Sequence, residues 1–323
     1  MELVKYAMET RRRIESFLLK KSYQAVTTYR CCIAVSSREV SIICVNKTAS
    51  AVELLFAEVI PYTNLGEVSL TLASIVKQHQ LAKIPVYWLL APEEYQLFLV
   101  DSLPVKDEEV RDALNWRIRS LINFPIDEAA IDYFSLPAKK SSPTNFMIAA
   151  VVAKTELLAK IAKLFEHSGL QLTVIDIPEL AMRNLTAVYE NDEKSTAFIY
   201  FYEKSAILNI TCNKTLFFSR HIKPPTTTAA SAEDYEQFSL EVTRYFDYFQ
   251  NQWRYARPTR VFIASSQDNV GNLAKILSDY LLLPVEPFPI TFILPEKMIV
   301  KNQQLLMLGS SLREELGHVT SGN

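Results

Sequence analysis

Glycine is scarce in this sequence: its 323 residues include only six, at positions 66, 169, 271, 309, 317 and 322. An average usage of about 7% would give roughly two dozen. Loops that hold phosphate groups need glycine, because a Cβ atom blocks both a positive φ and a close approach of the backbone to the ligand. We therefore expect a protein that holds partners together rather than a working nucleotide-dependent enzyme.

Several other features are also missing. The formal charge of -2 gives no overall field that favours nucleic acid. No signal-peptide pattern opens the chain, and no apolar run reaches the ~20 residues that span a bilayer, so we expect a cytoplasmic protein. The four cysteines, Cys31, Cys32, Cys44 and Cys212, include no CxxC pair. We expect them to be buried thiols in a reducing compartment, without a metal site.

Catalytic motifs are absent as well. The sequence has no P-loop and no G-x-S-x-G, H-E-x-x-H or G-x-G-x-x-G motif. The four histidines are scattered. The acidic residues 107–109 are best explained as stabilising the positive start of a helix. Asp127, Glu128 and Asp132 have no basic or nucleophilic companion fixed beside them. We therefore predict no catalytic and no metal-binding residues.

Hydrophobic periodicity predicts two successive rounds of α/β structure. The first round has strands at 29–35, 39–46, 52–60 and 84–91, an extended segment at 97–100, strands at 130–136, 146–153 and 170–177, and helices at 68–80, 107–122 and 155–168, the last ending at Gly169. The second has strands at 196–202, 205–212, 215–221, 260–265 and 283–288, and helices at 232–256, 269–280 and 303–316. Both rounds open with three short strands, a helix and a strand, and Asn-Lys-Thr follows the second strand of each, at 46–48 and 213–215. This predicts two related lobes.

The N-terminal segment predicts a basic amphipathic helix at 3–20, with six Lys and Arg residues among the first 21 positions. This helix has three interpretations: it docks on the protein's own core, lies on the inner face of a membrane, or binds another subunit. Docking is the default, because three interspersed glutamates weaken membrane binding.

Residues 103–137, LPVKDEEVRDALNWRIRSLINFPIDEAAIDYFSLP, resemble the PilM family of type IV pilus assembly proteins. That family has a "PF-P-x-E-E-x-x-x-D" stretch, which here reads Asn123-Phe124-Pro125-Ile126-Asp127-Glu128 with Asp132 downstream. The segment from FMIAAVVAKTELL to IPELAMRNL and the pair Leu312-Arg313 are also similar to the family. The resemblance covers roughly Tyr29 to Glu315. It is closest to MSHA biogenesis (MshI-like) members and to the cytoplasmic part of GspL.

The resemblance implies an α/β protein with the actin-like ATPase fold, a duplicated RNase H-like architecture of two lobes with a small inserted subdomain. The expected divisions are a basic N-terminal helix in 1–22, the first part of the first lobe in 23–96, the inserted subdomain in 97–153, the completion of the first lobe in 154–192, the second lobe in 193–316, and a disordered tail in 317–323.

The nucleotide turns depart from the family pattern. PilM proteins carry an Asp-x-Gly-Ser turn, a second Asp-x-Gly turn and a Gly-Gly pair on the adenosine side. The corresponding places here are Val35-Ser36-Ser37-Arg38, Tyr202-Glu203-Lys204-Ser205, and Ser265-Ser266-Gln267 with Gly271 further on. Because Mg-ATP needs a carboxylate near its metal and a close backbone approach, the three losses predict a degenerate ATPase without cofactor, a pseudo-ATPase.

The resemblance further implies a function and a partner. The protein would be a non-catalytic scaffold of type IV, MSHA-like pilus biogenesis, cytoplasmic and peripheral at the inner membrane. It would bind the cytoplasmic tail of a PilN/MshJ-like inner-membrane protein in a groove beside the inserted subdomain, together with other pilus assembly proteins. Trp116, Phe124, Pro125 and Ile126 are the predicted partner-binding residues, although Trp116 could instead pack on a neighbouring subdomain. The alternatives are an ATP-binding actin-like ATPase and a GspL-like component of type II secretion.

Overall fold

A computed structural model describes residues 29 to 314, apart from 49–50, 82–83, 103–104, 106–108, 139–145, 167, 191–193, 226–229, 267–269 and 295–299. The predicted N-terminal helix and C-terminal tail lie outside the described residues. The chain divides into two compact units, each described by itself below. Unit 1 comprises Met1–Ser135, Met147–Pro178 and Arg313–Asn323, and unit 2 comprises Leu136–Phe146 and Glu179–Leu312.

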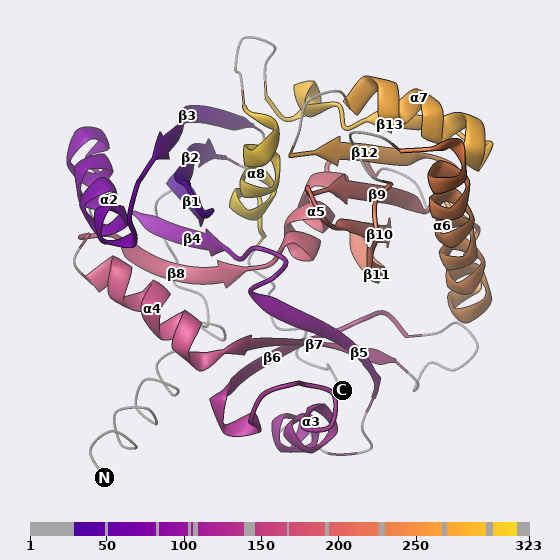
Figure 1. Ribbon diagram of the computed structural model, residues 1–323, viewed down its shortest axis with the longest axis horizontal. Helices are drawn as coiled ribbons and strands as arrows, with labels where there is room; N and C mark the ends of the chain where they lie inside the picture. The colour runs from indigo at the N-terminus through magenta and orange to yellow at the C-terminus, as the bar shows by residue number, and fades with distance from the viewer. Residues whose placement is uncertain are drawn as a thin grey trace. The chain divides into compact units, whose positions relative to one another are not determined.

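The main sheet of unit 1 has five strands in the order β3-β2-β1-β4-β8 (Figure 1). The first three form an antiparallel meander, and β4 and β8 continue the sheet in parallel with β1. The strands are β1 (Tyr29–Val35), β2 (Glu39–Lys47), β3 (Val52–Pro61), β4 (Pro85–Leu89) and β8 (Gln171–Asp176), with helices α2 (Leu65–His79) and α4 (Thr155–Glu166). Gly169 adopts a φ of 76°, which confirms the left-handed turn predicted after α4.

A second, smaller sheet of unit 1 is inserted between β4 and α4. Its three antiparallel strands are β5 (Tyr95–Asp101), β6 (Ala129–Ser135) and β7 (Met147–Lys154), in the order β5-β7-β6. Helix α3 (Val110–Ile118) belongs to the same insertion and buries Val110, Leu114 and Ile118, as its periodicity predicts. The sequence predicts one apolar stripe on the helix at 107–122, made of Val110, Leu114, Ile118, Leu121 and Ile122. Its continuation to Leu121 is wrong, because α3 ends at Ile118 and Leu121 is 48% exposed.

Unit 2 repeats the topology of the main sheet of unit 1. Its five strands lie in the order β11-β10-β9-β12-β13. Numbered along the chain within each main sheet, the strands of both units lie in the same order, 3-2-1-4-5. Again the first three are antiparallel and the last two are parallel to the first. This duplication is the actin-like fold predicted from the sequence. The elements are β9 (Thr196–Phe201), β10 (Ala206–Cys212), β11 (Thr215–Ile222), α6 (Ala232–Trp253), β12 (Val261–Ser265), α7 (Val270–Leu281) and β13 (Val285–Pro287).

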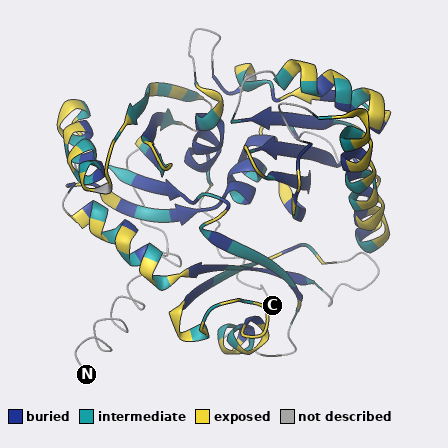
Figure 2. Cartoon of the chain, in the orientation of Figure 1, coloured by how far each residue is buried: buried dark blue, intermediate teal, exposed yellow. Residues whose placement is uncertain are grey.

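The sequence predicts that the helix at 232–256 packs one stripe against a sheet, made of Tyr235, Phe238, Val242, Tyr245, Phe246, Phe249 and Trp253. Helix α6 buries all of these except Tyr235 and Tyr245, which are half-buried. Phe238, Val242, Phe246, Phe249 and Trp253 are buried, and Ser231 caps the helix in a capping box with Asp234. Figure 2 shows dark blue strands in each sheet and helices that alternate between buried and exposed residues, as expected for helices that cover sheets. The stripe is therefore core.

Two further predictions from the sequence are wrong. Cys31 and Cys44 are not thiols but form a disulfide, because the antiparallel register of β1 and β2 places them opposite each other with their Cα atoms 4.1 Å apart. Cys32 and Cys212 are buried thiols, as predicted. The two Asn-Lys-Thr triplets are also not equivalent. Asn213 and Lys214 form a left-handed hairpin turn, whereas Asn46 and Lys47 are the last residues of β2.

Helix α5 (Pro178–Thr186) was not predicted from the sequence; it packs against the short C-terminal helix α8 (Leu305–Ser311) in unit 2. The side chain of Asn184 donates a hydrogen bond of 2.9 Å to the carbonyl of Gly309. Because α5 belongs to unit 2, the contacts divide the units at Pro178 and Glu179, earlier than the lobe boundary expected near residue 192.

Candidate functional site

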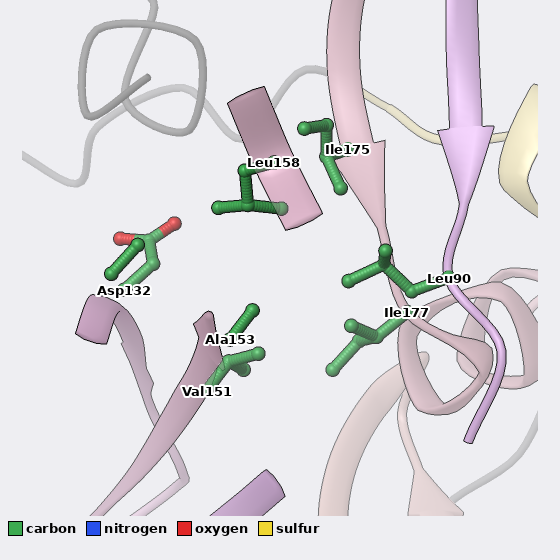
Figure 3. Close-up of a pocket in the computed structure, with 8 residues that line it drawn as sticks. Leu90, Asp132, Val151, Ala153, Leu158, Ile175 and Ile177 are labelled. Atoms are coloured by element: carbon green, nitrogen blue, oxygen red, sulfur yellow. The ribbon is translucent and has the colours of Figure 1, made fainter. Parts of the chain in front are cut away.

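Unit 1 contains a largely apolar hollow between the inserted sheet and the end of the main sheet (Figure 3). Its cavity volume is ≈ 20 Å³, about the room that one water molecule needs. Its lining residues come from five elements or their ends, β4, β6, β7, α4 and β8: Leu90, Ala130, Asp132, Val151, Ala153, Leu158, Ile175 and Ile177. We call this hollow the insertion pocket.

The alternation of side chains in β6 and β7 builds one wall of the insertion pocket. Ala130 lies opposite Ala153, and Asp132 lies opposite Val151, so the four residues form two cross-strand pairs on one face. Two of the four are alanines, whose small side chains leave room that larger residues would fill. The hollow in this wall therefore comes from the small alanine side chains, since the strands β6 and β7 are paired along it.

The opposite wall comes from the end of the main sheet and from α4. Leu90 follows β4, and its backbone N–H donates a 3.0 Å hydrogen bond to the carbonyl of Asp176. The Asp176 side chain accepts from the amide of Ile177 at 3.1 Å and from Arg313 Nη1 at 3.3 Å. These bonds fix the chain at the ends of β4 and β8, where Leu90 and Ile177 face the pocket (Figure 3).

Asp132 is the one acidic residue in the lining. Burial raises the pKa of its carboxyl, while the Tyr133 amide and the charges of Arg111 and Arg313 lower that pKa in part. Among the described residues, none donates a hydrogen bond to the buried Oδ1 atom of Asp132. The insertion pocket thus combines apolar walls with one hydrogen-bond acceptor.

The four predicted partner-binding residues do not line the insertion pocket. Trp116 is 75% exposed on α3, and Figure 1 draws α3 on the side of the inserted sheet away from α4. Pro125 is exposed, whereas Phe124 and Ile126 are half-buried, and the Lys154 ammonium lies 5.4 Å from the Phe124 ring centroid. Trp116 and residues 124–126, which follow α3 in the chain, lie outside the pocket lining, and we refer to them together as the α3 surface.

The first predicted phosphate turn, between β1 and β2, closes on itself. The Ser36 amide donates to the carbonyl of Glu39 at 3.0 Å, and the Ser36 hydroxyl accepts from the amides of Arg38 and Glu39. The Ser36 carbonyl accepts a hydrogen bond from the hydroxyl of Tyr62 at 2.5 Å. Ser36, Ser37 and Arg38 form a compact, exposed hairpin turn. The amide of Ser36 already donates a hydrogen bond within this turn.

The other predicted nucleotide residues lie in unit 2, at the ends of neighbouring strands. The turn with Lys204 and Ser205 follows β9 and is closed by a 2.8 Å bond from the Tyr202 amide to the Ser205 carbonyl. Ser265 ends β12, and the amide of Ser266 donates to the Phe201 carbonyl at 2.9 Å, which joins the two strand ends. Gly271 lies apart from this contact, in the first turn of α7.

The described part of the chain offers neither a metal centre nor a membrane span. No group of three His, Cys, Asp or Glu side chains there is arranged to hold a metal ion. Within the same ranges, no helix has both the length and the apolar character that crossing a membrane requires.

The fold is similar to that of known assembly proteins. Residues covering 88% of this chain superpose on 97% of a chain in the PilM-PilN type IV pilus biogenesis complex, with a TM-score of 0.68 and 14% identity. The cytoplasmic domain of EpsL, an inner membrane component of the type II secretion system of Vibrio cholerae, superposes with a TM-score of 0.50 and 12% identity, covering 89% of this chain and 96% of that domain. No family model and no curated protein matches the sequence. The chain has the actin-like ATPase fold, in the form found in PilM and in the cytoplasmic domain of EpsL.

Proposed function

We propose that this chain is a non-catalytic scaffold of a pilus assembly complex, located at the cytoplasmic face of the inner membrane. In this proposal the extended cytoplasmic tail of a PilN-like membrane protein binds beside the inserted sheet, across the mouth of the insertion pocket. The observation that carries the proposal is the PilM-like fold with its inserted three-stranded sheet, which has an apolar hollow beside it. An extended peptide there would gain side-chain burial and main-chain hydrogen bonds.

The chain is similar to proteins of two bacterial systems, type IV pilus biogenesis and type II secretion, and the two similarities differ in strength. The TM-score of 0.68 with the PilM chain, against 0.50 with EpsL, favours a pilus role over a type II secretion role. An MSHA-type system with an MshJ-like partner is the narrower form of the proposal. The exposed Trp116 on the α3 surface is available to a second assembly protein, since tryptophan is enriched at such contacts.

The proposal that the protein is a pseudo-ATPase rests on the turns that follow β1 and β9. The places where a related ATPase would present an aspartate and a glycine hold Ser36 to Arg38 and Glu203 to Ser205. The Ser36 amide is already engaged within its own turn. A phosphate chain would meet neither a metal-binding carboxylate nor a glycine backbone at these positions.

One pair of calorimetric titrations tests both parts of the proposed function. The full-length protein is titrated with Mg-ATP and, separately, with the synthetic tail of the PilN-like protein. We expect saturable binding of the tail and no binding of Mg-ATP at micromolar concentrations. Thermal unfolding provides a second readout, because a ligand that binds only the folded state raises the melting temperature. Micromolar Mg-ATP binding would contradict the non-catalytic proposal, and an inert tail would contradict the scaffold proposal.

A further inference from the structure

Leu282 has an unusual conformation and environment directly after the end of α7 in unit 2. Its side chain is 89% exposed, and its backbone adopts a φ of 55°. This left-handed conformation is common at helix ends, but it favours glycine or asparagine over a side chain such as leucine. A leucine here therefore strains the backbone and buries little within the chain. Backbone strain of this kind clusters at functional positions, so we looked for a role of Leu282 in binding.

The surroundings of Leu282 are aromatic and acidic. Helices α6 and α7 lie side by side (Figure 1), and the ring of Tyr280 stacks on that of Tyr235 with the centroids 6.3 Å apart. This stack joins the first turn of α6 to the last turn of α7. The exposed residues Glu236 and Asp279 are next to the two tyrosines in the chain. The α6–α7 surface is our name for the following residues: Glu233, Tyr235, Glu236, Asp279, Tyr280 and Leu282.

The α6–α7 surface carries an excess of negative charge. Glu233, Glu236 and Asp279 are exposed, and within the described ranges no ion pair joins any of them to a basic side chain. Helix α7 has one basic residue, Lys275. A partner that matches this surface needs an apolar side chain to cover Leu282 and basic side chains to meet the three carboxylates.

The chain itself contains a segment with that chemistry. Residues 1–21 hold six Lys and Arg residues against three Glu. Apolar residues recur among them at helical spacing: Val4, Ala7, Met8, Ile14, Phe17 and Leu18. This segment lies outside the described residues, and its sequence predicts a helix with one apolar and one basic face.

We propose that the N-terminal segment of one copy of this protein binds the α6–α7 surface of a second copy. Of the three interpretations of the segment, this one is binding to another subunit. Opposite charges and the exposed Leu282 support it. Two different surfaces meet in such a contact, so association continues into rings or chains and does not stop at a two-fold dimer. The proposal is independent of tail binding and goes beyond the proposed function.

The first experiment measures self-association of the full-length protein by sedimentation equilibrium. Leu282→Asn removes the apolar contact. Because asparagine tolerates a positive φ, this variant should melt at the same temperature as wild type or higher. The matched control is Leu70→Gln, since Leu70 is 72% exposed on α2 of unit 1. We expect Leu282→Asn to weaken self-association at least tenfold and Leu70→Gln to associate like wild type.

Charge reversal tests which two surfaces meet. One variant carries Glu236→Lys and Asp279→Lys, and the other carries Arg11→Glu, Arg12→Glu and Arg13→Glu. Each variant alone should associate at least tenfold more weakly than wild type, because like charges then face each other. An equal mixture should form a complex, since the reversed surface of one variant matches the reversed segment of the other. Added salt should weaken the wild-type association.

Three results would overturn the proposal. The first is a wild type that stays monomeric at every concentration measured, which would leave the segment to its own chain or to a membrane. The second is self-association that Leu282→Asn or either charge reversal leaves within twofold of wild type. The third is a mixture of the two reversed variants that forms no complex. None of these results bears on the proposed function, because the titration with the PilN-like tail tests that separately.

Discussion

Replacing Ala153 with leucine should abolish most of the tail binding while leaving the protein folded. Ala153 is 5% exposed, and its side chain lines the insertion pocket opposite Ala130. A leucine side chain is larger than the hollow of ≈ 20 Å³ and would protrude from its mouth, where the proposed tail buries an aliphatic side chain. Losing the burial of one such side chain removes about 1.5–3 kcal/mol, so we expect affinity to fall by roughly 10- to 150-fold.

The matched control for this substitution is Ala51→Leu. Ala51 is exposed before β3, in the same unit but outside the pocket lining. Calorimetry gives the affinity of each variant for the tail, and thermal unfolding shows whether it is folded. A folded Ala153→Leu protein that binds the tail as tightly as wild type would exclude the insertion pocket as the binding site.

Replacing Gly309 with alanine should strongly destabilise unit 2. A Cβ atom at this position would lie 2.3 Å from the carbonyl oxygen of Ala181 and 2.9 Å from Leu185 Cγ. The first of these atoms belongs to the backbone of α5, which cannot rotate away as a side chain can. Forced separation of α5 and α8 would also weaken the bond from Asn184 to the Gly309 carbonyl. We expect a loss of about 3 kcal/mol in the free energy of unfolding.

Gly271→Ala is the control for that prediction, measured by the same urea unfolding experiment. Gly271 lies in α7, and an added Cβ would meet nothing within 4 Å. Alanine is the better helix former, so stability should stay equal or rise by up to about 1 kcal/mol. If both substitutions lowered the free energy of unfolding by similar amounts, the close contact of α8 with α5 would not be the reason that position 309 needs glycine.

The fold was largely predictable because its signals are local. Alternating and 3.6-residue patterns predicted strands such as β1 and β10 and helices such as α6, and the repeated order of elements predicted two related lobes. Helix α5 was missed because IPELAMRNL is short and follows a strand without a clear break. The need for a glycine at position 309 was not visible either, because it depends on Ala181, far away in the sequence.

The candidate site was less predictable. Trp116 stands out in the sequence because it lies off the apolar stripe of α3, and its exposure agrees with that interpretation. The insertion pocket left no such signal. Its lining combines ordinary apolar residues from distant segments, and only the register of β6 with β7 brings Ala130 and Asp132 onto one face with Val151 and Ala153. Asp132 in the strand predicted at 130–136 is the one available hint, and the sequence fixes no basic or nucleophilic companion beside it.

The most direct test of the pocket assignment is to locate the bound tail by photo-crosslinking. The PilN-like tail carries a benzophenone side chain at each aliphatic position in turn, and crosslinked peptides of the full-length protein are identified by mass spectrometry. The account predicts crosslinks to residues of β6, β7 and α4 that line the insertion pocket, such as Val151 and Leu158. Crosslinks confined to Trp116 and the rest of the α3 surface, or to unit 2, would contradict it.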